Sequence, residues 1–161
     1  MRAWIAKFFR PARPMILDAR PSDAAVLAAL HGRSFAQGWS EGEFERLLAD
    51  RTVVAHVARN SSGAPIGFLL SRRAADEAEI LTVAVAGAAR GRGIARELLA
   101  RHLGRLAALG VVRVFLEVDD GNRPALLLYE RAGFREVGRR EGYYAGAQGS
   151  GAALTLRRDL L

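Results

Sequence analysis

A short loop in the middle of the chain, residues 90–93, alternates arginine and glycine. The apolar run 79–85 before it predicts a strand, and the apolar spacing of residues 94–109 after it predicts a helix. The first turn of a helix has free backbone N–H groups and the positive end of the helix dipole, and glycine lets a ligand approach them closely. With two arginine charges added, the loop is expected to bind a phosphate or pyrophosphate.

The composition is that of a globular domain with excess positive charge. The 161 residues are 50% hydrophobic and 25% charged, enough for one domain with a sizeable core. The chain has no cysteine, so disulfides, thiol catalysis and thiolate metal sites are excluded. The net charge of +7 favours an anionic partner such as a phosphorylated cofactor, RNA or a membrane surface. No apolar run approaches the roughly 20 residues of a membrane-spanning helix.

The first fourteen residues differ from the rest. We interpret residues 1–14 as a basic amphipathic N-terminal extension and residues 15–161 as a single domain. The apolar side chains that would share one side of a short helix in the extension are Trp4, Ile5, Phe8 and Phe9. Such a segment either packs on its own domain or is mobile, and the alternative is a helix that binds a membrane surface or a partner.

The rest of the chain alternates strand and helix signals. Strands are expected at 15–20, 52–59, 65–73, 79–85, 112–118, 134–144 and 151–160. Helices are expected at 21–35, after Ser40, at 94–109 and at 123–133. Ser22 is a candidate N-cap of the first helix, and Ser40 with Glu43 matches a capping box. This order predicts an α/β (α+β) domain in which helices cover a central sheet.

Other glycine-rich phosphate loops do not fit residues 90–95. A P-loop requires Gly-Lys-Ser/Thr, which the chain lacks, and a dinucleotide fingerprint beginning at Gly91 would place Arg96 at its third glycine. The hexapeptide Arg-Gly-Arg-Gly-Ile-Ala fits R/Q-x-x-G-x-G/A instead. In this loop the chain resembles the GNAT superfamily of acyl-CoA-dependent N-acyltransferases, whose pyrophosphate loop has that pattern after the fourth strand.

A second stretch narrows the resemblance to one branch. Residues 115–144 are similar to RimI-type protein N-terminal acetyltransferases, with the pattern LEV-x-x-x-N-x-x-A-x-x-LY-x-x-x-GF followed by RR-x-x-YY. The match includes AEILTVAV, and Phe35, Trp39 and Ser40 echo the family's aromatic-Trp-Ser element. The resemblance implies the GNAT fold, a single mixed, mainly antiparallel sheet of about seven strands flanked by about four helices.

The resemblance also implies an activity. It is acetyl transfer from acetyl-CoA, without a metal, to the N-terminal α-amine of a protein, directly within a ternary complex. The expected acceptor is the N-terminal alanine of small-subunit ribosomal protein eighteen, and the expected location is the cytoplasm, with no stable nucleic-acid binding and no transmembrane segment. Two alternatives stay open: the same fold acting on a lysine side chain or small-molecule amine, and a non-catalytic basic module that binds RNA.

By the same resemblance, two segments would hold the cofactor. The backbone of residues 81–85 would pair with the pantetheine arm and polarise the thioester carbonyl, and residues 90–95 would bind the pyrophosphate. Asn122 would hydrogen-bond the pantetheine. The expected cofactor-binding residues are Leu81, Thr82, Val83, Ala84, Val85, Arg90, Gly91, Arg92, Gly93, Ile94, Ala95, Asn122 and Tyr129.

The resemblance further implies two catalytic residues and a peptide site. Glu117 would be the general base, directly or through water, and Tyr129 the general acid for the departing thiolate. The expected peptide-binding residues are Trp39, Glu117, Tyr143 and Tyr144. An α-amine has a pKa of about 7.7 to 8.0 against about 10.4 for lysine, so one carboxylate is enough for an N-terminal acceptor.

Each of these residues also has a structural interpretation. Strand alternation could place Glu117 on a solvent face, and Tyr129 could be a packing residue of its helix. Arg139 and Arg140 are expected at an exposed, charged strand edge. The histidines have no metal-ligand spacing and are expected at the surface or with satisfied hydrogen bonds: His31, His56 and His102.

Overall fold

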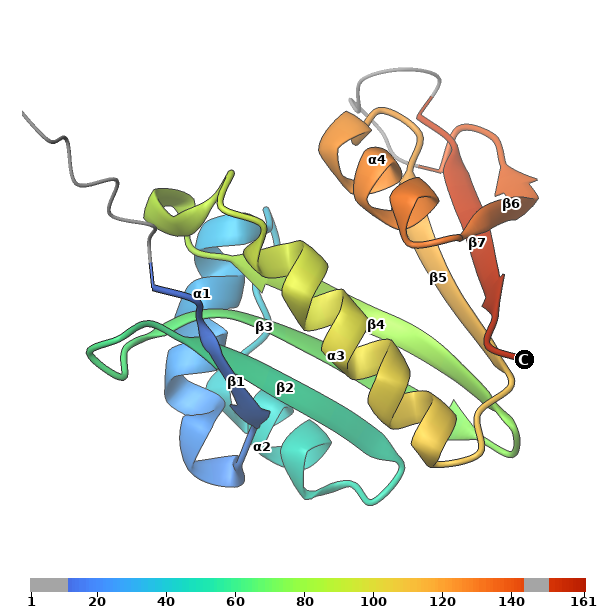
Figure 1. The fold of residues 1–161 in the computed structure, drawn as a ribbon. Coiled ribbons are helices and arrows are strands. Elements are labelled where there is room, and N and C mark those ends of the chain that lie inside the picture. Colours follow the sequence, from blue (N-terminus) through green and yellow to red (C-terminus); the bar gives the residue numbers. More distant parts are fainter. Residues whose placement is uncertain (1–11, 144–150) are drawn as a thin grey trace, which may run out of the picture.

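The computed structural model describes residues 12–143 and 151–161, which form one seven-stranded sheet with helices on both faces (Figure 1). The strands are β1 (Met15–Asp18), β2 (Val53–Arg59), β3 (Pro65–Ala74), β4 (Glu77–Val85), β5 (Arg113–Asp119), β6 (Arg135–Arg140) and β7 (Ala153–Asp159). The helices are α1 (Ala24–Ser34), α2 (Glu41–Ala49), α3 (Ile94–Ala108) and α4 (Arg123–Arg131). The strand order is β1-β2-β3-β4-β5-β7-β6, and only β4 and β5 pair in parallel. The predicted mixed, mainly antiparallel sheet with four helices is confirmed.

Adjacent residues of β3 show which helices cover which face. Phe68 and Leu70 lie in the core cluster of α1 and α2, whereas Leu69 lies in the cluster of α3 and α4. Because successive side chains of a strand point to opposite faces, α1 and α2 cover one face of the sheet and α3 and α4 the other. Each of these fully buried side chains contributes about 1.5–3 kcal/mol of transfer free energy to the fold.

The caps of the first two helices differ from each other. At α2 the predicted capping box is confirmed: the Ser40 hydroxyl accepts the N–H of Glu43 at 3.2 Å, and the Glu43 carboxylate accepts the N–H of Ser40 at 2.6 Å. The prediction of Ser22 as a cap is wrong, because a 3-10 turn, Pro21–Asp23, precedes α1 and places Asp23 at the N-cap. Asp23 accepts a hydrogen bond from Arg59 of β2 at 2.6 Å, which ties this turn to the sheet.

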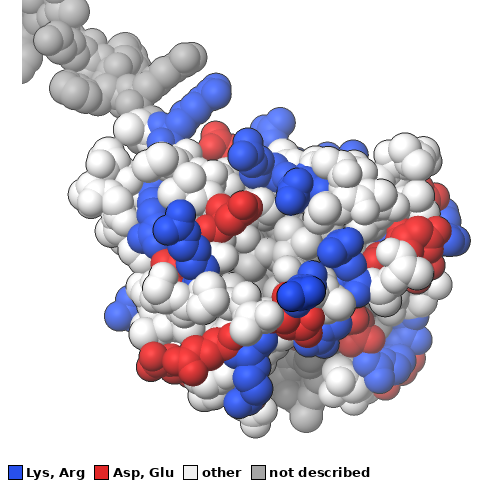
Figure 2. Space-filling model, turned by 90° about the horizontal axis from the view of Figure 1, so that it is seen from below, with Lys and Arg blue, Asp and Glu red and all other residues white. Residues whose placement is uncertain are grey.

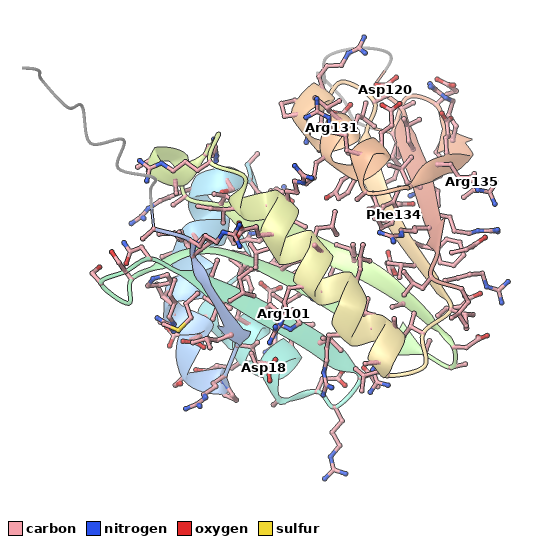
Figure 3. The ribbon with its side chains drawn as sticks, in the orientation of Figure 1. Asp18, Arg101, Asp120, Arg131, Phe134 and Arg135 are labelled. Carbon is pink, nitrogen blue, oxygen red and sulfur yellow. The ribbon has the colours of Figure 1, made fainter. Side chains whose placement is uncertain are left out.

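A chain of buried polar side chains links α3 to the sheet. His102 of α3 lies between His56 of β2, at 2.8 Å between the Nδ1 atoms, and Ser71 of β3, whose Oγ is 2.5 Å from Nε2 of His102. All three residues are buried. Asp18 of β1 lies 3.4 Å from Nε2 of His56, and Arg101 of α3 is close enough to that ring for its charge to lower the pKa of His56 (both are labelled in Figure 3). The predicted satisfaction of His56 and His102 is confirmed, in the core rather than at the surface.

Burial lowers the pKa of both rings of this pair, which favours their neutral forms. Burial, and then the neighbouring His56, lowers the pKa of His102 to about 3. Burial also lowers the pKa of His56, although Asp18 opposes that effect. The contact of His56 with the Asp18 carboxylate therefore involves a neutral imidazole that presents Nε2–H. Its Nδ1 then accepts from His102, and Nε2 of His102 accepts the hydroxyl of Ser71.

The sheet opens between β4 and β5. These strands pair only over residues 77–79 with 113–115, and beyond that point they diverge (Figure 1). On its other side β4 stays paired with β3, but the register shifts so that Leu81 has no partner between Ile80, opposite Ser71, and Thr82, opposite Leu70. A bulge bends a strand and increases its twist, which turns β4 away from β5.

Several predictions fall near or beyond the limits of the described residues. The strand expected at 134–144 ends earlier, at Arg140, so Tyr143 follows the strand rather than lying in it. Tyr144 and residues 1–11 of the predicted extension lie outside the described residues, and the extension stays a prediction. Among the helices described, none is both long and apolar enough to cross a membrane.

Candidate active site

A groove of about 1160 Å³ follows the opening between β4 and β5. Its walls come from the end of β4, from α3 and α4 with the loops that precede them, and from the end of α1. The predicted cofactor-binding residues that line it are Val83, Ala84, Val85, Arg90, Gly91, Gly93, Ile94, Ala95, Asn122 and Tyr129. Leu81, Thr82 and Arg92 lie outside this lining. The structure therefore brings most of the two predicted segments together in one groove.

The loop before α3 has a backbone that only glycine adopts easily. Gly91 and Gly93 have φ of +75° and +77°, and a Cβ added to either would meet no atom within 4 Å. Their conformation, rather than crowding, requires glycine. Gly93 is the N-cap of α3 and supplies no capping side chain, so the first N–H groups of the helix are available to an anion. Arg90 fixes the loop to β4, since its Nε donates to the carbonyl of Val85 at 3.1 Å.

The end of β4 directs backbone groups into the opening. Ala86 donates its N–H to the carbonyl of Ile66, next to β3, at 2.8 Å. In an antiparallel ladder alternate residues face the same neighbouring strand, so Ala84 also faces β3, and Val83 and Val85 face the opening. Their N–H groups fit the predicted role of pairing with the pantetheine and polarising a thioester carbonyl.

Tyr129 and Asn122 reach the groove from α4. Tyr129 is buried, its ring makes an edge contact with Phe134, and burial raises its pKa to about 12. The hydroxyl has no hydrogen-bond partner within the described part of the chain, so it is available as a donor in the groove. Asn122 caps α4, with Oδ1 accepting the N–H of Ala125 at 3.3 Å. Its amide NH₂ is the part that remains for a ligand.

Glu117 lies on the opposite face of β5 from Tyr129. Leu116 and Val118 are buried in the cluster that contains Tyr129, so alternation places Glu117 on the other face. Glu117 is half-exposed and does not line the groove. The two predicted catalytic residues therefore lie on opposite faces of the sheet at the opening. This arrangement suits a reaction in which the donor lies on one face and the acceptor on the other.

The carboxylate of Glu117 is paired with Arg140. Nη2 of Arg140 donates to Oε1 of Glu117 at 2.8 Å, and the guanidinium carbon of Arg140 lies 4.0 Å from the ring centroid of Tyr143. Tyr143 is exposed. Arg140 is on the edge strand and exposed, as predicted, but it contacts two predicted site residues, Glu117 and Tyr143. Sequence reasoning missed this arginine as part of the site.

The groove residues that were not predicted as site residues include Ser34 and Phe35, at the end of α1. Phe35 is exposed and stacks on the buried ring of His31, with 4.3 Å between the centroids, and Trp39 stacks on His31 at 4.6 Å. Nδ1 of His31 accepts the N–H of Trp39 at 3.1 Å, and burial lowers the pKa of His31, which favours this acceptor form. Trp39 itself lies outside the lining. The sequence signal that could have identified Phe35 as a groove residue is its place in the aromatic-Trp-Ser element, four positions before Trp39.

Comparisons with known proteins agree with this geometry. Residues 24–134 match the acetyltransferase (GNAT) family. The chain is 39% identical over 145 residues to the N-alpha-acetyltransferase RimI of Mycobacterium tuberculosis, covering 86% of this chain and 87% of that protein. It is 33% identical over 135 residues to the ribosomal protein bS18-alanine N-acetyltransferase of Salmonella typhimurium, covering 84% and 90%. The crystal structure of the ribosomal-protein-S18-alanine N-acetyltransferase from Escherichia coli has a TM-score of 0.83 at 25% identity, covering 91% of this chain and 94% of that one.

An opened mixed sheet, a glycine loop before α3 and the family match together define an acetyltransferase, and the chain belongs to the GNAT family. Its relatives at 31–39% identity over most of the chain place it in the RimI-type branch of that family. Both steps of the predicted resemblance are confirmed.

Proposed function

We propose that this enzyme transfers an acetyl group from acetyl-CoA to the N-terminal α-amine of a protein, and that its acceptor is the N-terminal alanine of ribosomal protein bS18. The acceptor is the one named for the relatives from Salmonella typhimurium and Escherichia coli. The observation that carries the proposal is the groove along the opened sheet, with Tyr129 on one face of β5 and Glu117 on the other. A cytoplasmic location belongs to the same proposal.

The described residues fit acetyl-CoA as the donor. The N-terminus of α3 and its glycine loop suit the pyrophosphate, and the backbone of Val83 and Val85 suits an extended pantetheine arm. When bound, acetyl-CoA supplies an acetyl group activated as a thioester. Among the described residues, no group of three or more His, Asp or Glu is placed to hold a metal ion.

The proposed chemistry follows from the position of each group. At neutral pH roughly a tenth of an α-amine is already free base, so Glu117, directly or through a water, needs to take only the proton released as the amine attacks. The N–H groups of Val83 and Val85 are available to stabilise the oxyanion. The raised pKa of Tyr129, about 12, lies above that of a thiol, about 8.5, so its hydroxyl stays protonated and donates a hydrogen bond to the departing sulfur.

Two other functions are alternatives to this proposal. The same fold acting on a lysine or a small-molecule amine would use the same donor groove and would differ only in its acceptor. An RNA-binding module would need a surface dominated by basic side chains. On the face seen in Figure 2, acidic side chains are interspersed among the basic ones. On that face, the mixture does not form the broad basic surface that an RNA-binding module would need.

Mass spectrometry of peptides incubated with acetyl-CoA tests the proposal. One peptide carries a free N-terminal alanine and no lysine, and a second is blocked at its N-terminus and carries one lysine. We expect acetylation of the first peptide and little or none of the second. Acetylation confined to lysine or to small amines would refute the N-terminal assignment. Salt-sensitive RNA binding without heat release on adding acetyl-CoA would support the RNA-binding module instead.

A further inference from the structure

The proposed base, Glu117, has a positive charge beside it. Arg140 donates to Oε1 at 2.8 Å, while Oε2 has no partner among the described residues. A substrate amine that approaches Glu117 therefore comes close to a guanidinium. This contact joins β5 to the edge strand β6, with β7 between them.

The guanidinium is held in place from two sides. Arg140 lies opposite Ala153 at the end of β6, and its guanidinium carbon lies 4.0 Å from the ring centroid of Tyr143, within cation–π range. Exposed ion pairs contribute little to folding stability, so stability alone gives little reason for this arrangement. Its charge is instead placed to act on a group that approaches Glu117.

Other charged groups lie on the same face of the sheet as Glu117: Asp119 of β5, and Arg157 of β7, which pairs with Asp159 at 2.9 Å. Thr155 of β7, directly across from Glu117, is uncharged. The Asp119 carboxylate, two residues along β5, accepts the N–H of Gly121 at 2.8 Å. Arg139 pairs with Asp120 at 3.4 Å. Arg140 is therefore the cation that contacts this carboxylate among the described residues.

We propose that Arg140 is a specificity-determining residue that makes the site select an amine that is already uncharged. The inference rests on the proposed function, in which Glu117 receives the proton of the attacking amine. An ammonium group is repelled by the guanidinium and competes with it for the carboxylate, whereas a neutral amine meets neither cost. Roughly a tenth of an α-amine is neutral at pH 7, against well under a hundredth of a lysine, so this charge favours N-termini.

The test compares wild-type enzyme with Arg140→Gln and Arg140→Lys. The two peptides are the alanine peptide and the blocked lysine peptide described above, and kcat/KM is measured for each from pH 6.5 to 9.5. In Arg140→Gln we expect the α-amine to lysine ratio to fall about tenfold, and activity at low pH to rise relative to high pH, because a protonated amine can now reach Glu117. Arg140→Lys keeps the charge and is expected to restore both properties.

The matched control is Arg139→Gln on the same strand, which is expected to leave the ratio and the pH profile unchanged. Arg140→Met keeps the apolar stem of the side chain and replaces the glutamine variant if that variant fails to fold. An unchanged ratio in the neutral variants, or a lysine variant that behaves like the glutamine variant, would overturn the proposal. A wild-type enzyme that ignores the alanine peptide would instead refute the proposed function, so the two failures are distinguishable.

Discussion

Glu117 and Tyr129 act in the same proposed reaction, but they lie on opposite faces of β5 and therefore have different surroundings. Tyr129 is enclosed by the core of α3 and α4, whereas Glu117 is half-exposed on the face that the acceptor would approach. Burial makes the tyrosine a weaker acid and so a persistent hydrogen-bond donor. The exposure of Glu117 leaves its carboxylate accessible to a peptide amine.

Substitution of Glu117 by Gln should lower kcat by about 10²-fold or more, because a general base in place typically contributes that much. Acetyl-CoA binding should change little, since Glu117 does not line the groove. Steady-state kinetics and calorimetry measure the two effects separately. Glu79→Gln, an exposed carboxylate on β4, is the matched control and should keep wild-type turnover. Equal turnover in both variants would exclude Glu117 as the base.

Substitution of Tyr129 by Phe should lower kcat by about tenfold or more while the protein folds normally, because the lost hydroxyl has no partner among the described residues. Because the pKa of Tyr129 is about 12, deprotonation of its hydroxyl should cause no loss of wild-type activity below pH 10. The pH profile of kcat and a thermal melt check both statements. A decline near pH 9 in the wild type that vanishes in the Phe variant would contradict this role.

At the scale of elements, α3 is attached to the sheet through neutral histidines. Because the folded-state pKa of His102 is about 3, only the unfolded chain takes up a proton there as the pH falls below the unfolded value of about 6.5. This stability is fully present above pH 6.5 and is lost progressively toward pH 3. Between pH 7.5 and 5.5 the loss from one such histidine is about 1.4 kcal/mol, and His56, shifted in the same direction, adds to it.

Urea unfolding at the two pH values measures this difference. In His102→Gln, His56 and Ser71 lose their buried partner, which should lower the free energy of unfolding by about 1–3 kcal/mol. The pH dependence of that free energy should also be smaller. His31→Gln is a second comparison: burial also lowers the pKa of His31, so this substitution should also reduce the pH dependence, but it leaves the contact between α3 and the sheet in place. An unfolding free energy independent of pH in the wild type would show that the pair is not held neutral.

The loop before α3 gives a second prediction at this scale. Gly93→Ala forces a non-glycine residue to φ near +77°, which should cost about 1–2 kcal/mol of stability and place a methyl group where we propose that the pyrophosphate binds. Acetyl-CoA affinity measured by calorimetry should fall about tenfold. Gly104→Ala, inside α3 with no atom within 4 Å of an added Cβ, should instead raise stability by about 0.5–1 kcal/mol and leave affinity unchanged. Equal affinities would argue against an anion site at this loop.

At the scale of the whole molecule, local patterns predicted the elements well. Apolar periodicity located the strands and α-helices of the described residues, and the Ser40 capping box is formed as expected. The prediction of Ser22 as an N-cap failed because three residues of 3-10 turn precede α1. Local spacing does not distinguish such a turn from the first turn of an α-helix. Much of the groove lining could be predicted because the two cofactor-binding segments, residues 81–85 and 90–95, are each continuous in sequence.

Contacts between distant segments were beyond the reach of these patterns. Arg140 meets Glu117 only because β7 inserts between their strands with a register shift between Glu136 and Gly138. His102 meets His56 and Ser71 only because α3 crosses β2 and β3 at one position. Such pairings depend on register and crossing geometry, which no single segment encodes. They are also the contacts on which the proposed specificity and the predicted pH dependence of stability rest.

The parting of β4 and β5 has a consequence for hydrogen exchange. Val83 and Val85 present backbone N–H groups to the opening, so in the free enzyme their amides should exchange with solvent like those of a sheet edge, although they lie in the middle of the sheet. Bound acetyl-CoA should slow the exchange of these two amides and leave that of Ala84, which faces β3, nearly unchanged. Protection that alternates along the end of β4 would be the signature of a cofactor taking the place of a strand.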